Sequence, residues 1–252
     1  MNDALYIAAT GMKAQTAQID SVANNVANAS TPGFKRGSMR FGDLMASSAM
    51  AVQGDALASP AGVKIAALQR SFAAGELKRV DDVMALAIQG DGFLEVQLPD
   101  GSAAFARSAR LEIGADRLLA TADGLPLRQH ISVPQDVRRI AIAEDGQVQG
   151  TDDAGRTTPL GRIDVATFAS PTGLTAIGDG LWQATARSGE AVLSPAGEAG
   201  AGRLKQGYQE QSNVQLVEEM VQLMVAQRAY EMNVKVMQAA DEIAGMTNNL
   251  RK

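Results

Sequence analysis

The residues that could carry out chemistry are few and scattered. His130 is the single histidine of this 252-residue chain, which contains no cysteine. A Ser-His-Asp triad or a histidine metal site would therefore have to use His130, which lies beside Ile131 in a predicted strand. The cysteine count excludes disulfides, thiolate zinc sites and cysteine nucleophiles. We expect His130 to be packed or solvent-facing, and an enzymatic alternative would rest mainly on it.

Other candidate motifs fit turns and solvated surfaces better than binding sites. Gly90-x-Gly92 lacks the third glycine of a dinucleotide fingerprint and precedes a strand, which favours a hairpin turn. Asp81-Asp82 and Asp152-Asp153 lack the ligand spacing of a calcium loop. Glu218-Glu219 are adjacent on a predicted helix and point about 100° apart. We therefore predict no catalytic residue, no cofactor, no metal site and no enzyme activity.

Composition restricts the classes of partner. The net charge is −5, the sequence pI is about 5.0, and lysine and arginine are scattered along the chain, so we expect no nucleic-acid partner. Residues 1–7 lack the basic region and the apolar run of a cleaved secretory signal. No apolar run approaches the length of a membrane span, so we expect a protein that is not membrane-embedded.

The longest periodic signal lies between Ser212 and Lys252. Apolar residues recur there at alternating spacings of four and three, as at the a and d positions of a coiled coil: Val225, Ala229, Met232, Val236, Ala239, Ile243, Met246 and Leu250. A second apolar stripe runs beside this series. A helix with two such stripes is expected to have neighbours on more than one side.

A matching pattern occupies the N-terminus. Between residues 3 and 27, apolar residues take the same heptad spacing, interrupted only by the polar Gln15: Leu5, Ala8, Met12, Ile19, Val22 and Val26. The helix is predicted to end near Ala29, because residues 28–33 concentrate helix-breaking residues around Pro32. Asn24, Asn25 and Asn28 lie in its last turns, where asparagine is a useful hydrogen-bonding side chain.

The central region changes character. Residues 34–82 read as a linker, with an extended or mobile loop from Ala46 to Gly62. From residue 83 to residue 204 the period becomes two, and Asp-Gly pairs such as Asp145-Gly146 mark turns. Short strands are predicted at 85–88, 93–96, 131–133, 140–142 and 163–168. This pattern indicates a compact, mainly antiparallel β domain with Trp182 in its core.

The predicted fold class is α+β, with long N- and C-terminal helices forming a coiled-coil domain and a central, mainly antiparallel β domain. The predicted boundaries are 1–33 for the N-terminal coiled-coil helix, 34–82 for the linker and extended loop region, 83–204 for the β domain and 205–252 for the C-terminal coiled-coil helix.

Several motifs resemble the bacterial flagellar basal-body rod and hook protein family. They are LYIAATGM at 5–12, ANNVANASTPGFKR at 23–36, AIQGDGF at 87–93 and QRAYEMN at 227–233. The residues are most similar to those of the distal rod subunit. A proximal rod subunit remains an alternative, because residues 46–62 form a shorter loop than a distal rod subunit implies.

The resemblance implies a structural subunit that self-assembles into a helical tube and transmits torque from motor to hook. It implies export without a cleaved signal through the flagellar type III apparatus, and a place in the periplasm-spanning rod of the basal body. Implied partners are further copies of the chain, proximal rod proteins, the hook protein and surrounding ring proteins.

We expect the two heptad series, with Asn24, Asn25 and Asn28, to form the assembly interface, because such long apolar stripes are costly to expose. The alternative is a soluble coiled-coil stalk that presents a β binding domain.

Overall fold

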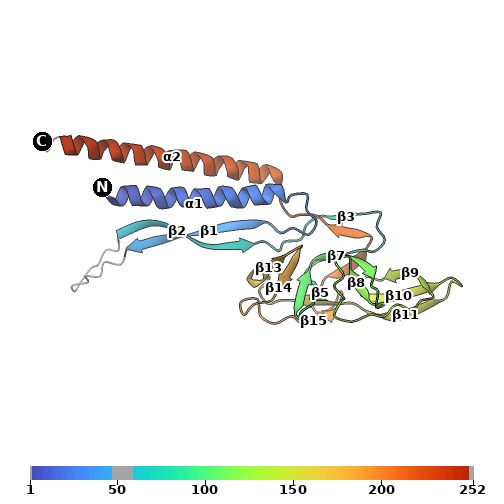
Figure 1. Cartoon of the computed structure of the whole chain (residues 1–252). Coiled ribbons are helices and arrows are strands. Elements are labelled where there is room, and N and C mark those ends of the chain that lie inside the picture. Colours follow the sequence, from blue (N-terminus) through green and yellow to red (C-terminus); the bar gives the residue numbers. More distant parts are fainter. Residues whose placement is uncertain (1, 47–58, 250–252) are drawn as a thin grey trace. The chain divides into compact units, whose positions relative to one another are not determined.

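A computed structural model describes residues 2–46 and 59–249 (Figure 1). The chain divides into two compact units. The first, which we call the terminal unit, comprises residues 1–29, 36–71 and 214–252. The second, the β unit, comprises residues 30–35 and 72–213. Both ends of the chain thus contribute to one unit, and the middle of the chain forms the other.

Two long helices form most of the terminal unit. Helix α1 spans Asn2–Ala27 and helix α2 spans Leu216–Asn249, and they lie side by side and antiparallel (Figure 1). Small side chains, Ala8, Ala14 and Ala226, are buried in this unit. The two long helices confirm the α+β class, whereas a coiled-coil geometry stays a prediction.

Helix α2 begins later than the boundary predicted at residue 205. Strands β16 (Arg203–Gln206) and β17 (Tyr208–Glu210) occupy that stretch instead. Between them Gly207 has a φ of 76°, a left-handed conformation that a helix does not contain. Heptad spacing therefore located the helix but not its first residue.

A β-hairpin replaces much of the linker predicted for residues 34–82. Strands β1 (Gly37–Ala46) and β2 (Ser59–Arg70) pair antiparallel, and both contact α1. The register shifts between Arg40 and Phe41 and again between Leu44 and Met45, so the alternation of a regular strand is interrupted. Residues 47–58 of the predicted loop lie outside the described residues.

The β unit contains short strands joined by tight turns, and every described strand pair is antiparallel. Its strands, besides β16 and β17, are β3 (Leu77–Arg79), β4 (Ala85–Gln89), β5 (Leu94–Gln97), β6 (Ala103–Ala106), β7 (Ser108–Ile113), β8 (Leu119–Thr121), β9 (Val137–Ile142), β10 (Gln147–Asp152), β11 (Thr157–Arg162), β12 (Asp164–Thr167), β13 (Thr175–Gly178), β14 (Leu181–Gln183) and β15 (Val192–Pro195). A short 3-10 helix, η1, spans Pro171–Gly173.

These strands form two four-stranded sheets, with the orders β16-β4-β7-β8 and β13-β14-β6-β5. A three-stranded sheet, β11-β10-β9, and the ribbons β12-β15 and β17-β3 complete the described pairing. The predicted strands at 85–88, 93–96, 140–142 and 163–168 overlap β4, β5, β9 and β12. The prediction of a strand at 131–133 is wrong, because only Ser132 pairs there, in a single bridge to Leu118. Pro134, which follows Val133, has no amide hydrogen to extend the pairing.

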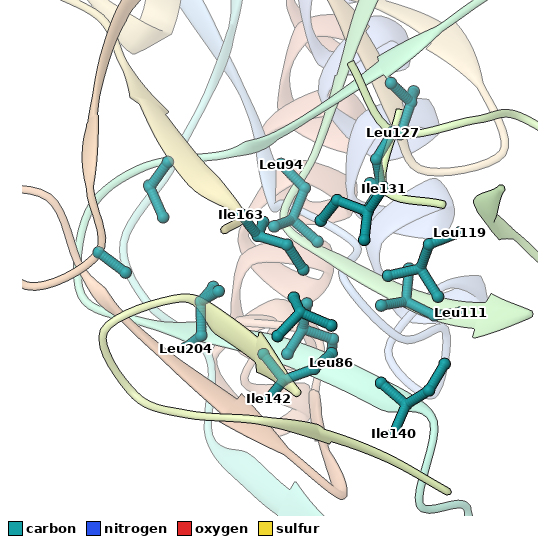
Figure 2. Packing of buried hydrophobic residues seen from close by; sticks show 14 of the residues in the cluster. Leu86, Leu94, Leu111, Leu119, Leu127, Ile131, Ile140, Ile142, Ile163 and Leu204 are labelled. Carbon is teal, nitrogen blue, oxygen red and sulfur yellow. The ribbon is translucent and has the colours of Figure 1, made fainter. Parts of the chain in front are cut away.

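Two apolar clusters stabilise the β unit. The larger is aliphatic, and Figure 2 shows its side chains, among them Leu86, Leu94 and Ile163, converging from several strands. The smaller is aromatic: Phe72 and Trp182 meet edge to face with their ring centroids 4.8 Å apart. Trp182 is a core residue, as predicted.

Candidate assembly surface

A buried polar junction fixes the end of the terminal unit where α1, α2 and β1 meet. The Asn25 side chain accepts a hydrogen bond from the Gly37 amide (2.9 Å) and donates to the Gly37 carbonyl oxygen (2.8 Å). It also donates to Glu219 Oε2 (3.0 Å), and Arg36 Nε donates to Glu219 Oε1. Asn25 and Glu219 are both buried. The junction aligns the C-terminal end of α1 with the first turn of α2.

A glycine allows the helices to approach closely further along. A Cβ atom added at Gly11 would lie 3.0 Å from Asn233 Nδ2, tighter than ordinary packing. Gly11 and Asn233 belong to the two terminal motifs noted in the sequence. This proximity gives those motifs a physical basis, because a side chain at position 11 would require the Asn233 side chain to shift.

The predicted C-terminal series lies on a different side of α2 from the contact with α1. Val225 is 63% exposed, whereas Ala226, the next residue, is 2% exposed. The exposed members of the series are Val225, Met232, Val236, Ala239, Ile243 and Met246; Ala229 is half-buried, and Leu250 lies outside the described residues. The series therefore does not form the contact between the helices of one chain, and it remains a predicted surface for other copies.

The N-terminal series is divided between the interior and the surface. Ala8 and Val22 are buried; Leu5, Met12, Ile19 and Val26 are half-buried. Among the asparagines, Asn25 is buried in the polar junction, Asn24 is exposed, and the half-buried Asn28 donates a hydrogen bond to the Asn24 carbonyl oxygen. The structure thus brings Asn25 into the terminal unit itself, and leaves Asn24 available to other molecules.

Further exposed apolar residues lie beyond the predicted set. On α2 they include Val217, 77% exposed, with Val221 and Met224 on the following turns. On the hairpin, Phe41, Ile65 and Leu68 are also exposed. Val217, Val221 and Met224 belong to neither apolar stripe of the sequence, and the bulged hairpin carried no periodic signal, so sequence reasoning missed both groups. Helices that are apolar on more than one side are usually buried on those sides, which indicates a contact surface for other protein chains.

A buried ionic cluster within the β unit was missed by sequence reasoning. Glu210 Oε1 accepts a hydrogen bond from Lys35 Nζ (2.9 Å), and Glu210 Oε2 accepts one from Arg107 Nε (3.0 Å). Lys35 also donates to the Ala73 carbonyl oxygen (2.8 Å), and Arg107 donates to the Gly92 carbonyl oxygen (2.6 Å). Lys35, Arg107 and Glu210 are far apart in the sequence, so no local spacing of residues could predict the cluster.

The cluster shifts the ionisation of its members. Burial opposes the charge on Glu210, but the hydrogen bonds and charges of Arg107 and Lys35 outweigh it and hold the pKa of Glu210 below its ordinary value. Burial also lowers the pKa of Lys35, because the attraction of Glu210 only partly offsets the loss of hydration. The cluster therefore ties residues 30–35, at the end of the N-terminal motif, into the β unit.

The residues considered for chemistry do not converge. His130 is exposed, and its ring lies 3.1 Å from Gln97 Oε1. Across residues 2–46 and 59–249, no three histidine, aspartate or glutamate side chains are grouped as a metal site would need. Neither helix, over its described length, has an apolar stretch long enough to cross a membrane. Exposed apolar surface is thus the dominant functional feature of the described chain.

Three family models match separate parts of the chain. The model described as "Flagella basal body rod protein" matches residues 5–35. The model described as "Flagellar hook protein FlgE/F/G D1 domain" matches residues 87–150. The model described as "Flagellar basal body rod FlgEFG protein C-terminal" matches residues 205–250. The matches cover α1, part of the β unit and α2.

Full-length relatives carry the same name. The flagellar basal-body rod protein FlgG of Borreliella burgdorferi is 38% identical over 266 residues, covering all of both chains. FlgG of Caulobacter vibrioides is 38% identical, covering 98% of this chain and 99% of its own. The flagellar hook protein FlgE of Escherichia coli is 36% identical over 172 residues, covering 68% of this chain and 41% of its own. The chain therefore belongs to the FlgG family of flagellar basal-body rod proteins.

Proposed function

We propose that this chain is a structural subunit of the distal flagellar rod, which assembles with copies of itself into a helical tube and transmits torque from motor to hook. The full-length similarity to rod proteins named FlgG supports the distal position over a proximal one. The match to a hook protein covers only part of both chains and supports the hook as a neighbouring assembly. Proximal rod proteins, ring proteins and the flagellar export apparatus are the other proposed partners.

The observation that carries this proposal is the exposed apolar series on α2. Val225, Met232 and Val236 are each more than half exposed, although burying one such side chain contributes roughly 1.5–3 kcal/mol. A tube built from many copies removes this surface from water along every subunit. The burial of this surface stabilises every contact between copies, as a rod that transmits torque requires.

The proposed place of the rod is the periplasm-spanning part of the basal body, reached by export without a cleaved signal. The terminal unit supports this route, because its helices pair with few large buried side chains inside one chain. Most of the stability of a helix in a protein comes from tertiary packing, so the ends of a free subunit, which lack the contacts of neighbouring copies, are easily unfolded. An unfolded end can be threaded through a narrow export channel and can refold on the growing rod.

A charge placed in the exposed series tests the proposal. Val225→Asp is expected to reduce incorporation of the subunit into purified basal bodies by tenfold or more, because a contact that buries a carboxylate in apolar surroundings loses about 1.4 kcal/mol or more. The β unit is expected to stay folded, as reported by the fluorescence of Trp182, which lies in its aromatic cluster. Incorporation is measured by quantitative mass spectrometry of the basal bodies.

Gln227→Asp is the matched control. Gln227 is exposed on the same helix, and it lies about 200° around the axis from Val225 because successive residues are separated by about 100°. This variant adds the same charge and is expected to assemble normally. Native incorporation and motility with Val225→Asp would refute the proposed role of the α2 series.

A further inference from the structure

A groove runs between α1 and the hairpin within the terminal unit. Its volume is about 320 Å³. Tyr6, Thr10 and Lys13 line it from α1, and Leu44, Lys64 and Ile65 line it from β1 and β2. Leu44 and Ile65 give it an apolar floor, and the two lysines stand on opposite walls, one on the helix and one on the hairpin.

The charges of this groove call for an acidic occupant. Lys13 and Lys64 are both exposed, and neither takes part in an ion pair among the residues that the structure describes. Thr10 Oγ1 already hydrogen-bonds to the Ile7 carbonyl oxygen and the Val63 amide. A segment that pairs with both walls therefore needs two carboxylates and apolar side chains beside them.

The C-terminal end of α2 has this chemistry and extends past α1. Asn25 contacts Glu219 and Gly11 faces Asn233, so the antiparallel register places Asn2 level with Glu242. In Figure 1 the C-terminal end of α2 reaches beyond the N-terminal end of α1. The part of α2 near and beyond this level, which we call the overhang, includes the exposed residues Asp241, Glu242, Ile243 and Met246.

We propose that the overhang of one copy docks in the groove of the next copy, so that Asp241 and Glu242 pair with Lys13 and Lys64. This inference rests on the proposed function and names the contact through which copies join. Adjacent residues on a helix point about 100° apart, so one carboxylate can face each wall of the groove. Met246, one turn beyond Glu242 and about 40° around the axis from it, covers the apolar floor.

The remaining charges of α2 are compatible with this docking. Lys235, the described cation nearest to the overhang, precedes Glu242 by about two turns, roughly 10 Å along the axis, and stays outside the groove. The Arg228 side chain is paired with Glu231 (2.9 Å). Among the described residues of α2, the acidic pair is therefore the charge that lies in the overhang.

The proposed contact can also build a filament from copies of one chain. The groove and the overhang are different surfaces, so each copy donates one and receives the other. Such a heterologous contact does not close on itself in pairs, and when its rotation does not close a ring it generates an open helical filament. The docking thus accounts for growth by successive addition of one kind of subunit.

Reversing the charges tests the pairing. Lys13→Glu with Lys64→Glu, and separately Asp241→Lys with Glu242→Lys, are each expected to lower incorporation into purified basal bodies by about tenfold or more, because like charges then face each other. The chain carrying all four changes restores opposite charges and is expected to recover incorporation to within about threefold of the native level.

Lys78→Glu with Arg139→Glu provides the matched control. Both residues are exposed in the β unit and the change in net charge equals that of the groove double variant, so incorporation is expected to stay at the native level. Native incorporation of either groove or overhang double variant overturns the inference. So does a fourfold variant no better than the doubles, which would mean that the groove holds another partner.

A cross-link gives an independent readout, because the native chain has no cysteine. Chains with Ile65→Cys and chains with Met246→Cys, carrying different affinity tags, are produced in the same cells. Mild oxidation of their basal bodies is expected to link the two kinds of chain in one disulfide-bonded dimer. No such dimer overturns the docking, whereas absence of the native chain from basal bodies would overturn the proposed function itself.

Discussion

Glu210 holds two cations in place inside the β unit. Lys35 lies in the N-terminal motif, Arg107 lies between β6 and β7, and Glu210 ends β17. A carboxylate that bridges these segments fixes their mutual positions in a way that neutral packing would not. Removing one partner of a buried ion pair leaves the other charge uncompensated, which is more costly than the pair itself is stabilising.

Glu210→Gln is therefore expected to destabilise the β unit by about 3–5 kcal/mol at neutral pH, because it leaves Lys35 and Arg107 buried without an anion. Trp182 fluorescence during urea unfolding measures the change, since this tryptophan is the single one in the chain and lies in the β unit. Glu198→Gln is the control: Glu198 is exposed, and its replacement is expected to change stability little.

The contribution of Glu210 to the stability of the β unit depends on pH. The folded pKa of Glu210 is below its ordinary value of 4.5, so its stabilising contribution is fully present above that pH and is lost as the pH falls through the folded pKa. The native β unit is expected to lose stability across this acidic range more steeply than Glu210→Gln. Equal slopes for the two chains would contradict the role assigned to the carboxylate.

At the scale of the elements, α2 is a helix with two different apolar sides. One side approaches α1 through small residues and through the contact of Gly11 with Asn233. The other exposes the heptad series that begins at Val225. Close approach on the first side leaves the second side directed away from α1, which is what a subunit with contacts to several copies requires.

Gly11→Leu is expected to lower the stability of the α1–α2 pairing by about 1–3 kcal/mol, because the added side chain must displace Asn233. Gly245→Ala is the matched helix substitution. A Cβ atom at Gly245 meets nothing within 4 Å, so this change is expected to stabilise α2 by up to about 1 kcal/mol. Thermal unfolding followed by far-ultraviolet circular dichroism measures both, and a shift of the same sign for the two variants would contradict the contact.

Some helices and turns could be predicted from sequence patterns, and other elements could not. The heptads predicted both helices, and Asp-Gly pairs marked turns such as the one at Gly146, where φ is 88°. The hairpin was missed because two register shifts interrupt its alternation. The Lys35–Glu210 pair joins residues that only the folded chain brings together. Heptad spacing likewise could not say which apolar stripe faces α1, since that depends on the close approach at Gly11.

At the scale of the whole molecule, the two ends of the chain build one unit and the middle builds the other. The terminal unit buries mainly small side chains between its helices, whereas the β unit has an aliphatic and an aromatic cluster. The terminal unit consequently gains less from folding within one chain and more from contact with other copies. The β unit can stay folded while the terminal unit exchanges partners.

This difference predicts how a protease will act on the chain before and after assembly. In the free subunit, limited proteolysis is expected to remove the terminal unit first and to leave a fragment containing Phe72–Asn213, because helices of marginal stability open often enough to be cut. In purified rods both ends are expected to be protected, since neighbouring copies cover the exposed series. Mass spectrometry of the fragments distinguishes the two states. If the ends of the free subunit resist cleavage as well as those in the rod, the helices are stable by themselves, and a monomeric stalk presenting the β unit explains the chain better than assembly-coupled folding.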